Sequence, residues 1–302
     1  MVNPSSGAGK AGREWSGIET WLPGTGLQYE VAYTTRPLEA TEIAQRAVRE
    51  SRPAVVAVGG DGTLNEVVNG FFHNGAPIPT TTRLAMVPLG TGGDFRRTLR
   101  IPLDPKAAIG VITTGLVRRL DAGCVTYQNS EGQTAVRHFI NIGDAGYGGE
   151  VVHRVNRGSK RLGAATFMWT ALTSLLAYKN KPMNVNVDGT SHDIVGQQVV
   201  VANCQYFGGG MRMAPSASPT DGVFDVVLIG DAGKLESIRG MSKIRSGQHL
   251  DERNPKIQLM YGKRISITST EKVRIDLDGE DAGFLPALFE IQPGAIEFIT
   301  PR

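Results

Sequence analysis

The chain of 302 residues has little of what thiolate metal sites, disulfide frameworks and nucleic-acid binding require. Its two cysteines, Cys124 and Cys204, lie far apart in the sequence and form no CxxC pair. They argue against zinc and disulfides and favour a reducing, cytoplasmic setting. The five histidines are scattered without an HExxH motif, so we expect any metal ion to be held by oxygen ligands. The formal net charge of +3, without a dense lysine and arginine block, argues against a nucleic-acid partner.

The chain also lacks an apolar run that could span a bilayer. The longest run, residues 163–178, is interrupted by threonine and serine. It is shorter than the roughly 20 residues that a membrane span needs. The N-terminus is polar and glycine-rich and shows no signal-peptide pattern. We therefore interpret the run as a helix that packs on a core or lines an apolar groove.

The most informative segment joins a strand to a helix through a glycine-rich loop. The β-branched run 55–58 stops at residues 59–63, which read Gly-Gly-Asp-Gly-Thr. Apolar side chains then follow at amphipathic-helix spacing: Leu64, Val67, Val68, Phe71 and Phe72. Such a loop suits a phosphate, because backbone N–H groups point outward and the helix dipole favours negative charge. Since Asp61 would repel a bare phosphate, we expect a metal ion or water between them.

Loops of this kind recur twice more in the first hundred residues. A second apolar run, 84–87, leads into a glycine-rich loop with threonine and aspartate at 88–94. Residues 3–7, Asn-Pro-Ser-Ser-Gly, form a third candidate loop. A lone Gly-Gly-Asp-Gly is equally typical of a β-turn. Three such loops together predict a functional site rather than ordinary turns.

The pattern of strands and helices changes near residue 122. Residues 1–122 alternate strand and helix, which predicts a mainly parallel sheet that binds ligands beyond its carboxyl ends. Helices are expected over 38–50 and from Asp104 as N-cap to Gly115. Later β-type runs lie at 136–142, 183–187, 197–203, 223–229, 264–268, 273–277 and 295–300, with helices only around 162–178 and 234–246. We therefore predict an α/β domain over 1–122 and a strand-rich domain over 123–302.

Together with motifs late in the chain, these loops resemble the diacylglycerol kinase catalytic domain, in the bacterial lipid-kinase branch related to the sphingosine kinases. The motifs that carry the resemblance are residues 3–7, 59–63, 88–91, 207–211, 220–222 and 278–280. They span essentially the whole chain. Gly-Gly-Asp-Gly-Thr is shared with the NAD kinases, whereas the late motifs favour a lipid kinase. The resemblance implies a nucleotide-binding α/β domain, a β-sandwich-like second domain and an active site in the cleft between them.

The resemblance implies ATP as co-substrate. It places the following residues in the nucleotide site: Asn3, Pro4, Ser5, Ser6, Gly7, Thr35, Gly59, Gly60, Asp61, Gly62, Thr63, Leu64, Asn65, Glu66, Gly90 and Thr91. It implies Glu280 as the base that accepts a lipid hydroxyl proton, with Asp278 and Asp61 completing the catalytic set. Phosphoryl transfer to an alcohol needs such a carboxylate, together with cations that hold the transferred group.

Two magnesium sites are also implied. Asp61, Asp121 and Asp278 would form the catalytic network, and Asp221 would bind a structural ion together with the backbone carbonyl groups of Ser218 and Val223. Considered alone, the Asp-Gly of residues 278–279 is the commonest hairpin signal. Residues 220–222 are likewise typical of a simple turn.

The chain departs from the family pattern in several places. Gly93 replaces the usual asparagine, which removes one side-chain amide from the second loop and is expected to weaken nucleotide contact. Thr220 replaces a frequent aspartate, and Pro-Ser-Ala at 215–217 replaces Pro-Asp-Ala, so the structural magnesium site carries less negative charge. Only two residues precede Asn3, so the first strand of the α/β domain is expected to be mostly missing.

The sequence thus favours an ATP-dependent kinase that converts diacylglycerol to phosphatidic acid. Phosphatidylglycerol or a sphingoid base stays open as the substrate, NAD kinase is a second alternative, and a catalytically weak nucleotide- and lipid-binding protein is a third. The basic residues Arg154, Arg157, Lys160 and Arg161 precede the apolar run 163–178. They suggest a peripheral membrane surface, although a solvated helix face explains them equally. The sequence leaves a homodimer open.

Overall fold

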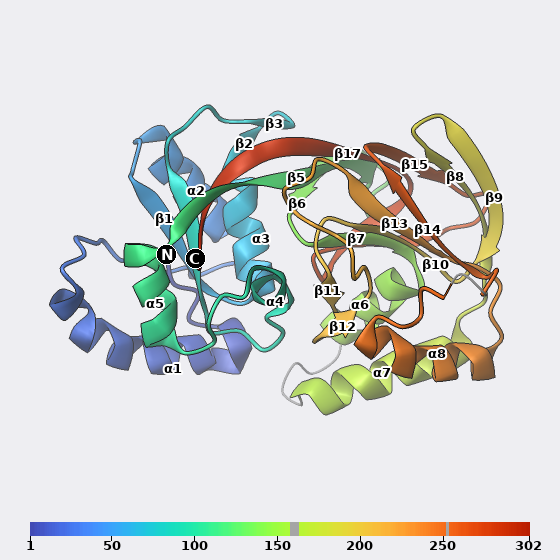
Figure 1. Ribbon diagram of the computed structural model, residues 1–302, viewed down its shortest axis with the longest axis horizontal. Helices are drawn as coiled ribbons and strands as arrows, with labels where there is room; N and C mark the ends of the chain where they lie inside the picture. The colour runs from blue at the N-terminus through green and yellow to red at the C-terminus, as the bar shows by residue number, and fades with distance from the viewer. Residues whose placement is uncertain (158–162, 252–253) are drawn as a thin grey trace. The chain divides into compact units, whose positions relative to one another are not determined.

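The computed structural model describes residues 1–157, 163–251 and 254–302, and it divides into two compact units. Unit 1 contains Met1–Leu120 and Gly294–Arg302, and unit 2 contains Asp121–Pro293 (Figure 1). The long strands β5 (Leu116–Gln128) and β17 (Glu280–Thr300) each contribute residues to both units. The compact units thus differ from the predicted domains, 1–122 and 123–302, at the C-terminal end of the chain. The last nine residues belong to unit 1, because Phe298 pairs with Leu84 there.

Unit 1 is an α/β unit built on parallel strands. β1 pairs with β4 in parallel from Ala54 opposite Arg83 to Gly59 opposite Pro88, and Val2 adds a parallel bridge to Val58. This confirms the predicted α/β class. The elements that lie wholly in unit 1 are α1 (Ser6–Trp21), α2 (Glu39–Arg49), β1 (Ala54–Gly59), α3 (Asp61–Asn69), β2 (Phe72–His73), β3 (Ala76–Pro77), β4 (Arg83–Pro88), α4 (Asp94–Leu99) and α5 (Pro105–Thr114), with a 3-10 turn at Leu22–Thr25.

The helices of unit 1 follow from local sequence. In α2, Ala40, Ala44 and Val48 recur every four residues and are all buried, so the helix presents one apolar face. The N-cap predicted for α5 is confirmed: the carboxylate of Asp104 accepts a hydrogen bond of 2.8 Å from the amide of Ala107. Pro105 then occupies the first turn, where a backbone N–H would have no acceptor within the helix, so its absence costs no hydrogen bond.

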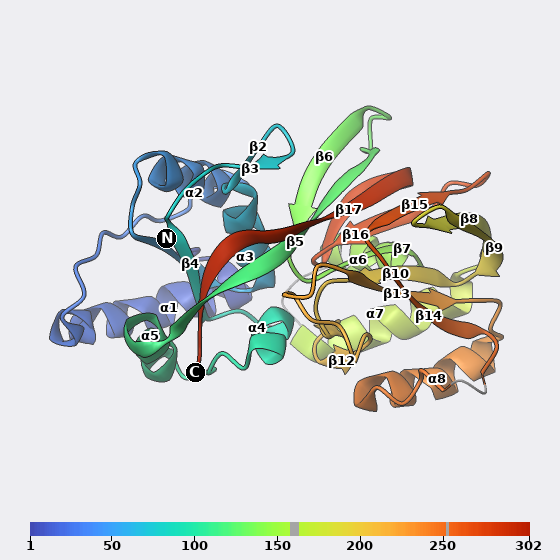
Figure 2. The same cartoon turned by 45° about the horizontal axis from the view of Figure 1, so that its top comes forward.

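Unit 2 is dominated by antiparallel strands. Their order is β14-β13-β10-β7-β16-β17-β15-β8-β9, and β5 and β6 pair as a two-stranded ribbon (Figure 2). Helices α6, α7 and α8 lie on one face of this sheet (Figure 1). The elements are β6 (Thr134–Phe139), β7 (Ile142–Gly146), α6 (Tyr147–Arg157), α7 (Gly163–Ala177), β8 (Lys181–Val187), β9 (Thr190–Gly196), β10 (Gln198–Ala202), β11 (Tyr206–Phe207), β12 (Met211–Arg212), β13 (Phe224–Ile229), α8 (Lys234–Ser246), β14 (Ile257–Gly262), β15 (Arg264–Thr268) and β16 (Arg274–Leu277).

Several sequence expectations for unit 2 need correction. The strand predicted over 136–142 is two strands, β6 and β7, interrupted at Ile140 and Asn141. The strand predicted at 295–300 is only the end of β17, which begins at Glu280. Helix α6 was missed, because Gly148 and Gly149 in its first turn are poor helix formers. Of the basic run, Arg154 and Arg157 lie in α6, whereas Lys160 and Arg161 lie outside the described residues.

Two aspartates form a buried carboxyl pair in unit 2. Asp144 of β7 lies opposite Asp276 of β16, and their exposed fractions are 0 % and 5 %. Burial raises the pKa of Asp144 to about 7, and burial together with the charge of Asp144 raises the pKa of Asp276 well above its usual value. One oxygen of Asp144 accepts a hydrogen bond of 3.1 Å from the amide of Gly149 in α6. The pair therefore favours a bound proton near neutral pH.

This pair predicts a stability that falls with pH. An unfolded carboxyl loses its proton near pH 4, whereas Asp144 in the folded protein keeps its proton until about pH 7. The free energy of unfolding should therefore decrease between pH 4 and 7. A neutral asparagine side chain retains an acceptor for the amide of Gly149 and adds a donor. The substitution Asp144→Asn should therefore flatten this decrease and stabilise the protein at pH 8 by roughly 1–3 kcal/mol.

Urea unfolding at pH 5, 6.5 and 8 measures the effect. The exposed Glu131→Gln variant is the matched control, because it removes a carboxyl that is not buried. Parallel pH profiles for the wild type and Asp144→Asn would contradict the role assigned to the pair.

Candidate functional site

In unit 1, the loops that follow β1 and β4 begin side by side. The two strands are parallel neighbours, and the amide of Leu89 donates a hydrogen bond of 2.8 Å to the carbonyl oxygen of Gly59. The carboxyl ends of parallel strands form the edge at which α/β proteins bind ligands. Residues 59–63 and 88–94 therefore share that edge.

Glycine allows these loops to approach more closely than side chains would permit. A Cβ atom on Gly90 would lie 2.2 Å from the Cα of Gly60, and one on Gly7 would lie 2.8 Å from the carbonyl oxygen of Leu89. A Cβ on Gly60 would lie 3.4 Å from Ser6 Oγ. The three glycine loops therefore meet, and their walls are largely backbone.

The segment 3–7 is tied directly to the β1 loop. The amide of Asn3 donates to the carbonyl oxygen of Val58 at 3.1 Å, and Asn3 Nδ2 donates to Thr63 Oγ1 at 2.9 Å. Thr63, Leu64 and Asn65 are buried in the first turns of α3, where Thr63 underlies Gly59. Their side chains therefore support the loop from the interior of the unit.

Thr35 is engaged in a different way. Its amide and hydroxyl both donate to the Glu39 carboxylate, at 2.5 and 2.9 Å, which places Glu39 at the start of α2. The neighbouring amide of Thr34 donates to the carbonyl oxygen of Val2 at 3.0 Å, so the segment stays close to the N-terminus of the chain. A structural role at the start of α2 is thus sufficient to explain Thr35.

Asp61 has a structural partner that the sequence did not reveal. Its carboxylate accepts hydrogen bonds from the amides of Asp94 and Phe95, at 3.0 and 3.4 Å, and so caps α4 from the neighbouring loop. Asp94 lies in the first turn of that helix, and its carboxylate pairs with Arg97 Nη1 at 2.9 Å. The same Asp61 carboxylate is thus a loop-to-loop connection as well as a candidate metal ligand.

Gly93 adopts a left-handed conformation, with φ of +64°. A Cβ there would meet Arg96 Nε at 2.9 Å, so the Arg96 side chain occupies the space next to this position. Arg97 Nη1 donates to the carbonyl oxygens of Gly92 and Gly93, at 2.6 and 2.9 Å. Arginine side chains therefore hold a loop that in the family pattern carries an asparagine.

In unit 2, Asp278 orders a bend in the backbone. Its carboxylate accepts hydrogen bonds of 3.0 Å from each of three successive amides, those of Ile140, Asn141 and Ile142. Asp278 itself lies in a turn, with φ of +53° followed by +85° at Gly279. The interactions fix the orientation of the Asp278 side chain, and they explain why β6 and β7 are separate strands.

Sequence reasoning missed Asn203, which is completely buried beside this bend. Its Nδ2 donates to the carbonyl oxygens of Ile140 and Asp121, at 2.7 and 3.0 Å. The amides of Asn203 and Cys204 both donate to the carbonyl oxygen of Asn141 at 3.0 Å. A buried asparagine directly after the apolar run 199–202 was the available signal, since an amide inside a core requires partners.

Asp121 and the turn that carries Asp221 are brought together. The amide of Gly222 donates to Asp121 Oδ2, and the amide of Asp121 donates to the carbonyl oxygen of Pro219, both at 2.8 Å. Asp221 is exposed and accepts a hydrogen bond of 3.2 Å from the amide of Val223. Ser218 lies in the same turn, with its hydroxyl 3.1 Å from that of Thr220.

A buried aspartate not singled out from the sequence lies next to this turn. Asp225 Oδ2 accepts a short hydrogen bond of 2.5 Å from Ser216 Oγ. Burial, opposed by this bond and assisted by the charge of Asp221, raises the pKa of Asp225 to about 6. The serine in Pro-Ser-Ala therefore supplies a donor where the family's usual aspartate would add a second carboxylate.

The carboxylates offer the oxygen atoms that magnesium prefers. Among the described residues, no three His, Cys, Asp or Glu side chains are grouped to hold a metal ion by themselves. Asp121, Asp221 and Asp278 each use carboxylate oxygens on backbone amides. The donor chemistry thus fits magnesium if water, backbone or substrate oxygens complete the coordination.

Glu280 begins β17 directly after the Asp278–Gly279 turn. It pairs with Leu277 of β16, and its side chain is half-buried. The turn thus carries Asp278 and Glu280 on either side of a glycine, and the fixed backbone of residues 140–142 holds it through Asp278.

Comparison with known families matches both parts of the chain. Residues 1–125 match the diacylglycerol kinase catalytic domain, and residues 142–300 match the YegS C-terminal NAD kinase beta sandwich-like domain. The predicted two-domain architecture, with a β-sandwich-like second domain, is thereby confirmed.

Individual relatives agree with this assignment. The diacylglycerol kinase of Bacillus subtilis strain 168 is 30% identical over 100% of this chain and 95% of its own length. A crystal structure from Bacillus anthracis strain Sterne, assigned as a diacylglycerol kinase, has a TM-score of 0.76 and 25% identity, and the match covers 99% of this chain and 95% of that one. Yeast NADH kinase shares the fold alone, with a TM-score of 0.50, 13% identity, and coverage of 94% of this chain and 77% of its own.

Because Asp61 caps α4 and is also a candidate metal ligand, a suitable substitution should affect turnover more than stability. Asp61→Asn keeps one acceptor oxygen, for the 3.0 Å bond from the amide of Asp94, gives up the longer 3.4 Å bond from the amide of Phe95, and removes the negative charge. We expect the melting temperature to change little and turnover to fall by about 100-fold or more. Asp104→Asn, which alters the cap of α5 in the same way, is the control and should retain turnover. Near-normal turnover of Asp61→Asn would limit Asp61 to its capping role.

Gly93 predicts a gain of nucleotide affinity on substitution. Asparagine tolerates the left-handed region, and the atoms that a Cβ would meet belong to the Arg96 side chain rather than to the backbone. Gly93→Asn should tighten ATP binding by the ~0.5–1.5 kcal/mol of one net hydrogen bond. Calorimetry measures this against Gly93→Ala, which introduces the same Cβ without the amide. If the two variants bind ATP equally, the amide makes no contact.

Proposed function

The chain belongs to the diacylglycerol kinase family and is a lipid kinase, and on this premise we propose that it transfers the γ-phosphate of ATP to the hydroxyl of diacylglycerol. ATP is the co-substrate that the kinase family implies. The product would be phosphatidic acid. Phosphatidylglycerol and sphingoid bases are lipid alcohols with the same reacting group, and they are the competing substrates.

The observation that carries the nucleotide assignment is the meeting of three glycine loops at the carboxyl ends of β1 and β4. A Cβ on Gly90 would clash with the backbone of Gly60 and one on Gly7 with the carbonyl oxygen of Leu89, and α3 begins at Asp61. Backbone amides and the positive end of a helix dipole bind phosphate oxygens without side-chain charge. We assign the phosphates of ATP to this place.

In the proposed reaction, the lipid hydroxyl oxygen forms a bond to the γ-phosphorus as the bond to the bridging oxygen of ADP breaks. Glu280 accepts the hydroxyl proton, and ADP leaves with the bridging oxygen. Magnesium, when bound, neutralises charge on the phosphate oxygens. Asp61, Asp121 and Asp278 are the residues that we propose to hold it, and each carboxylate also accepts a hydrogen bond from a backbone amide. Asp221, Ser218 and Val223 would hold a separate structural ion.

A labelled-ATP assay tests the substrate. The purified chain is incubated with diacylglycerol, phosphatidylglycerol, sphingosine and NAD, each in the same detergent, with a no-acceptor control. We expect the fastest transfer to diacylglycerol. Preferential labelling of another acceptor would overturn the substrate assignment while leaving a kinase, and transfer to none would indicate a binding protein.

If Glu280 is the general base, its removal should lower turnover without weakening ATP binding. Glu280→Gln should lower kcat by about 10²–10⁴-fold, the usual contribution of a general base. ATP affinity, measured by calorimetry, should stay within a few-fold of the wild type. Glu271→Gln removes an exposed carboxylate ahead of the same hairpin and should leave both quantities unchanged. A collapse of ATP binding would instead make Glu280 a metal or structural residue.

We also propose that the enzyme meets its lipid at a membrane surface. Among the described residues, no helix is long and apolar enough to cross a membrane. Helix α7 packs inward through Ala171 and Leu175, yet it exposes Trp169 by 67% and Leu176 by 57%. The neighbouring α8 packs inward through the partly buried Met241 and Ile244, and it exposes Leu235 beside basic residues, among them Arg239 and Lys243. Apolar side chains beside cations suit an anionic bilayer.

This surface predicts salt-dependent binding to vesicles. Sedimentation should show tighter binding to vesicles with anionic phospholipid than to neutral vesicles, with the difference decreasing as salt rises. Arg239→Glu, one helical turn from the exposed Leu235 on α8, should weaken anionic binding by roughly tenfold, since each cation near the surface contributes about 1 kcal/mol. Arg49→Glu makes the same charge change on α2 and is the control. Equal sedimentation with both vesicle types at low salt would refute the surface.

A further inference from the structure

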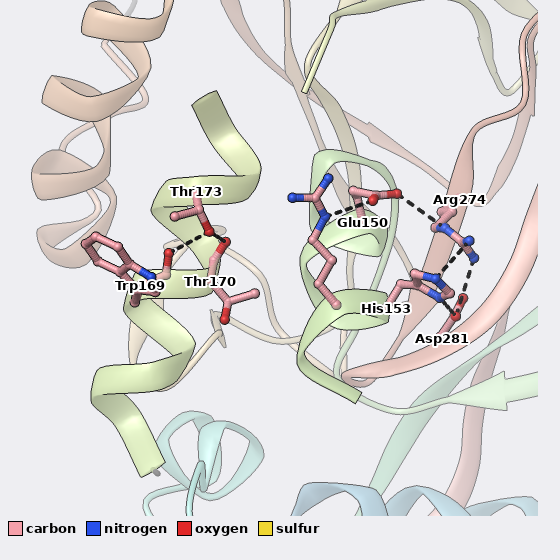
Figure 3. A network of polar contacts seen from close by, with 8 residues as sticks. Glu150, His153, Trp169, Thr170, Thr173, Arg274 and Asp281 are labelled. Atoms are coloured by element: carbon pink, nitrogen blue, oxygen red, sulfur yellow. Dashed lines mark hydrogen bonds and ion pairs between the residues drawn. The ribbon is translucent and has the colours of Figure 1, made fainter. Parts of the chain in front are cut away.

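Helix α6 is joined to the hairpin of β16 and β17 by a network of charged side chains. His153 Nδ1 lies 2.5 Å from Asp281 Oδ2, and Arg274 Nη1 lies 3.4 Å from the same oxygen. Arg274 Nη2 lies 3.1 Å from His153 Nε2, so the three side chains form a closed triangle (Figure 3). His153 comes from α6, Arg274 from β16 and Asp281 from β17.

The chemistry of the triangle fixes where the imidazole proton lies. A guanidinium group only donates hydrogen bonds, so His153 Nε2 must accept from Arg274. The remaining proton of the neutral ring therefore sits on Nδ1 and is donated to Asp281. Asp281 thus accepts hydrogen bonds from two side chains that also contact each other.

Arg274 also contacts two residues outside the triangle. Its Nε lies 3.3 Å from Glu150 Oε2 on α6, and its guanidinium carbon lies 4.8 Å from the centre of the Phe284 ring. Glu150 also pairs with Arg154 at 3.0 Å. Arg274 is therefore fixed by an acid, an aromatic ring and the His153–Asp281 pair.

The network includes the direct neighbour of Glu280, the residue to which the proposed function assigns proton transfer. Asp281 follows Glu280 in β17, and neighbouring residues of a strand point to opposite faces of the sheet. The other end of the turn is held by Asp278 through the amides of residues 140–142. The backbone of Glu280 thus lies between two fastened positions, one at Asp278 and one at Asp281.

We propose that His153 and Arg274 are positioning residues that set the place of Glu280 through its neighbour Asp281. The inference rests on the proposed function, in which Glu280 accepts the hydroxyl proton. His153 and Arg274 act from the opposite face of the strand and touch no reacting atom. Their effect is transmitted by the backbone of residues 280–281.

The burial of the network favours positioning over simple stabilisation. The exposed fractions of Glu150, His153, Arg274 and Asp281 lie between 17% and 28%. Partly buried ion pairs lose much of their attraction to desolvation, so apolar side chains would stabilise the fold equally well. Directional charged contacts instead hold a backbone in one place, and a displacement of about 1 Å at a catalytic group costs as much as 10²-fold in rate.

The experiment removes each positioning residue and measures kcat, KM for ATP and melting temperature. His153→Ala and Arg274→Met should lower kcat by about 10- to 100-fold, with KM for ATP changed by less than about threefold. His153→Asn keeps a donor for Asp281 and should retain more activity than His153→Ala. The matched controls are His73→Ala, an exposed histidine of unit 1, and Arg264→Met, which breaks the exposed pair with Glu290. Both controls should keep kcat.

The same variants in a Glu280→Gln background show how the network acts. If His153 works through Glu280, His153→Ala should cause no further loss in that background. An equal additional loss would overturn the inference and make the network a general structural element. An unchanged kcat for folded His153→Ala, beside an impaired Glu280→Gln, would also overturn it while leaving the proposed function intact. An unimpaired Glu280→Gln would instead remove the role of Glu280 and the inference together.

Discussion

The structure depends on aspartate carboxylates that bind the backbone amides of a different loop. Asp278 accepts from three amides at residues 140–142, Asp61 from two at the start of α4, and Asp121 from the amide of Gly222. Bends in a chain leave amides without strand or helix partners, and such groups are costly when they are buried. A carboxylate satisfies several amides at once. These contacts therefore allow irregular loops to be fixed next to regular strands.

The same carboxylates are the candidates for holding magnesium, and the two uses are compatible. An amide hydrogen bond occupies one lone pair of an oxygen atom, and each ionised carboxylate offers about four such positions. Backbone contacts orient the side chain in advance, as the partners of metal ligands generally do. It follows that removing one of these aspartates changes loop structure and charge together. Substitution by asparagine, which keeps an acceptor oxygen, separates the two effects better than alanine.

Sequence reasoning recovered the elements whose signals are local. The strands and loops around residues 54–63 and 83–94 were found because each has an apolar run that ends at a glycine-rich loop, and α5 was found from its cap at Asp104. Helix α6 was missed, since the glycines in its first turn have low helix propensity. The cap that Asp61 provides for α4 joins residues 33 and 34 positions apart. No local pattern encodes such a contact, because only the pairing of β1 with β4 brings the loops together.

The network on α6 illustrates the same limit at a greater distance. His153 and Asp281 are 128 positions apart, and a lone histidine on a helix carries no signal of an acidic partner on a distant strand. The family motif ends at Glu280, so a resemblance built on motifs stops one residue before Asp281. Placement of a catalytic group depends on the residues that hold its backbone as much as on the group itself. Residues next to a motif, on the opposite face of the strand, are therefore the places to seek further positioning contacts in this fold.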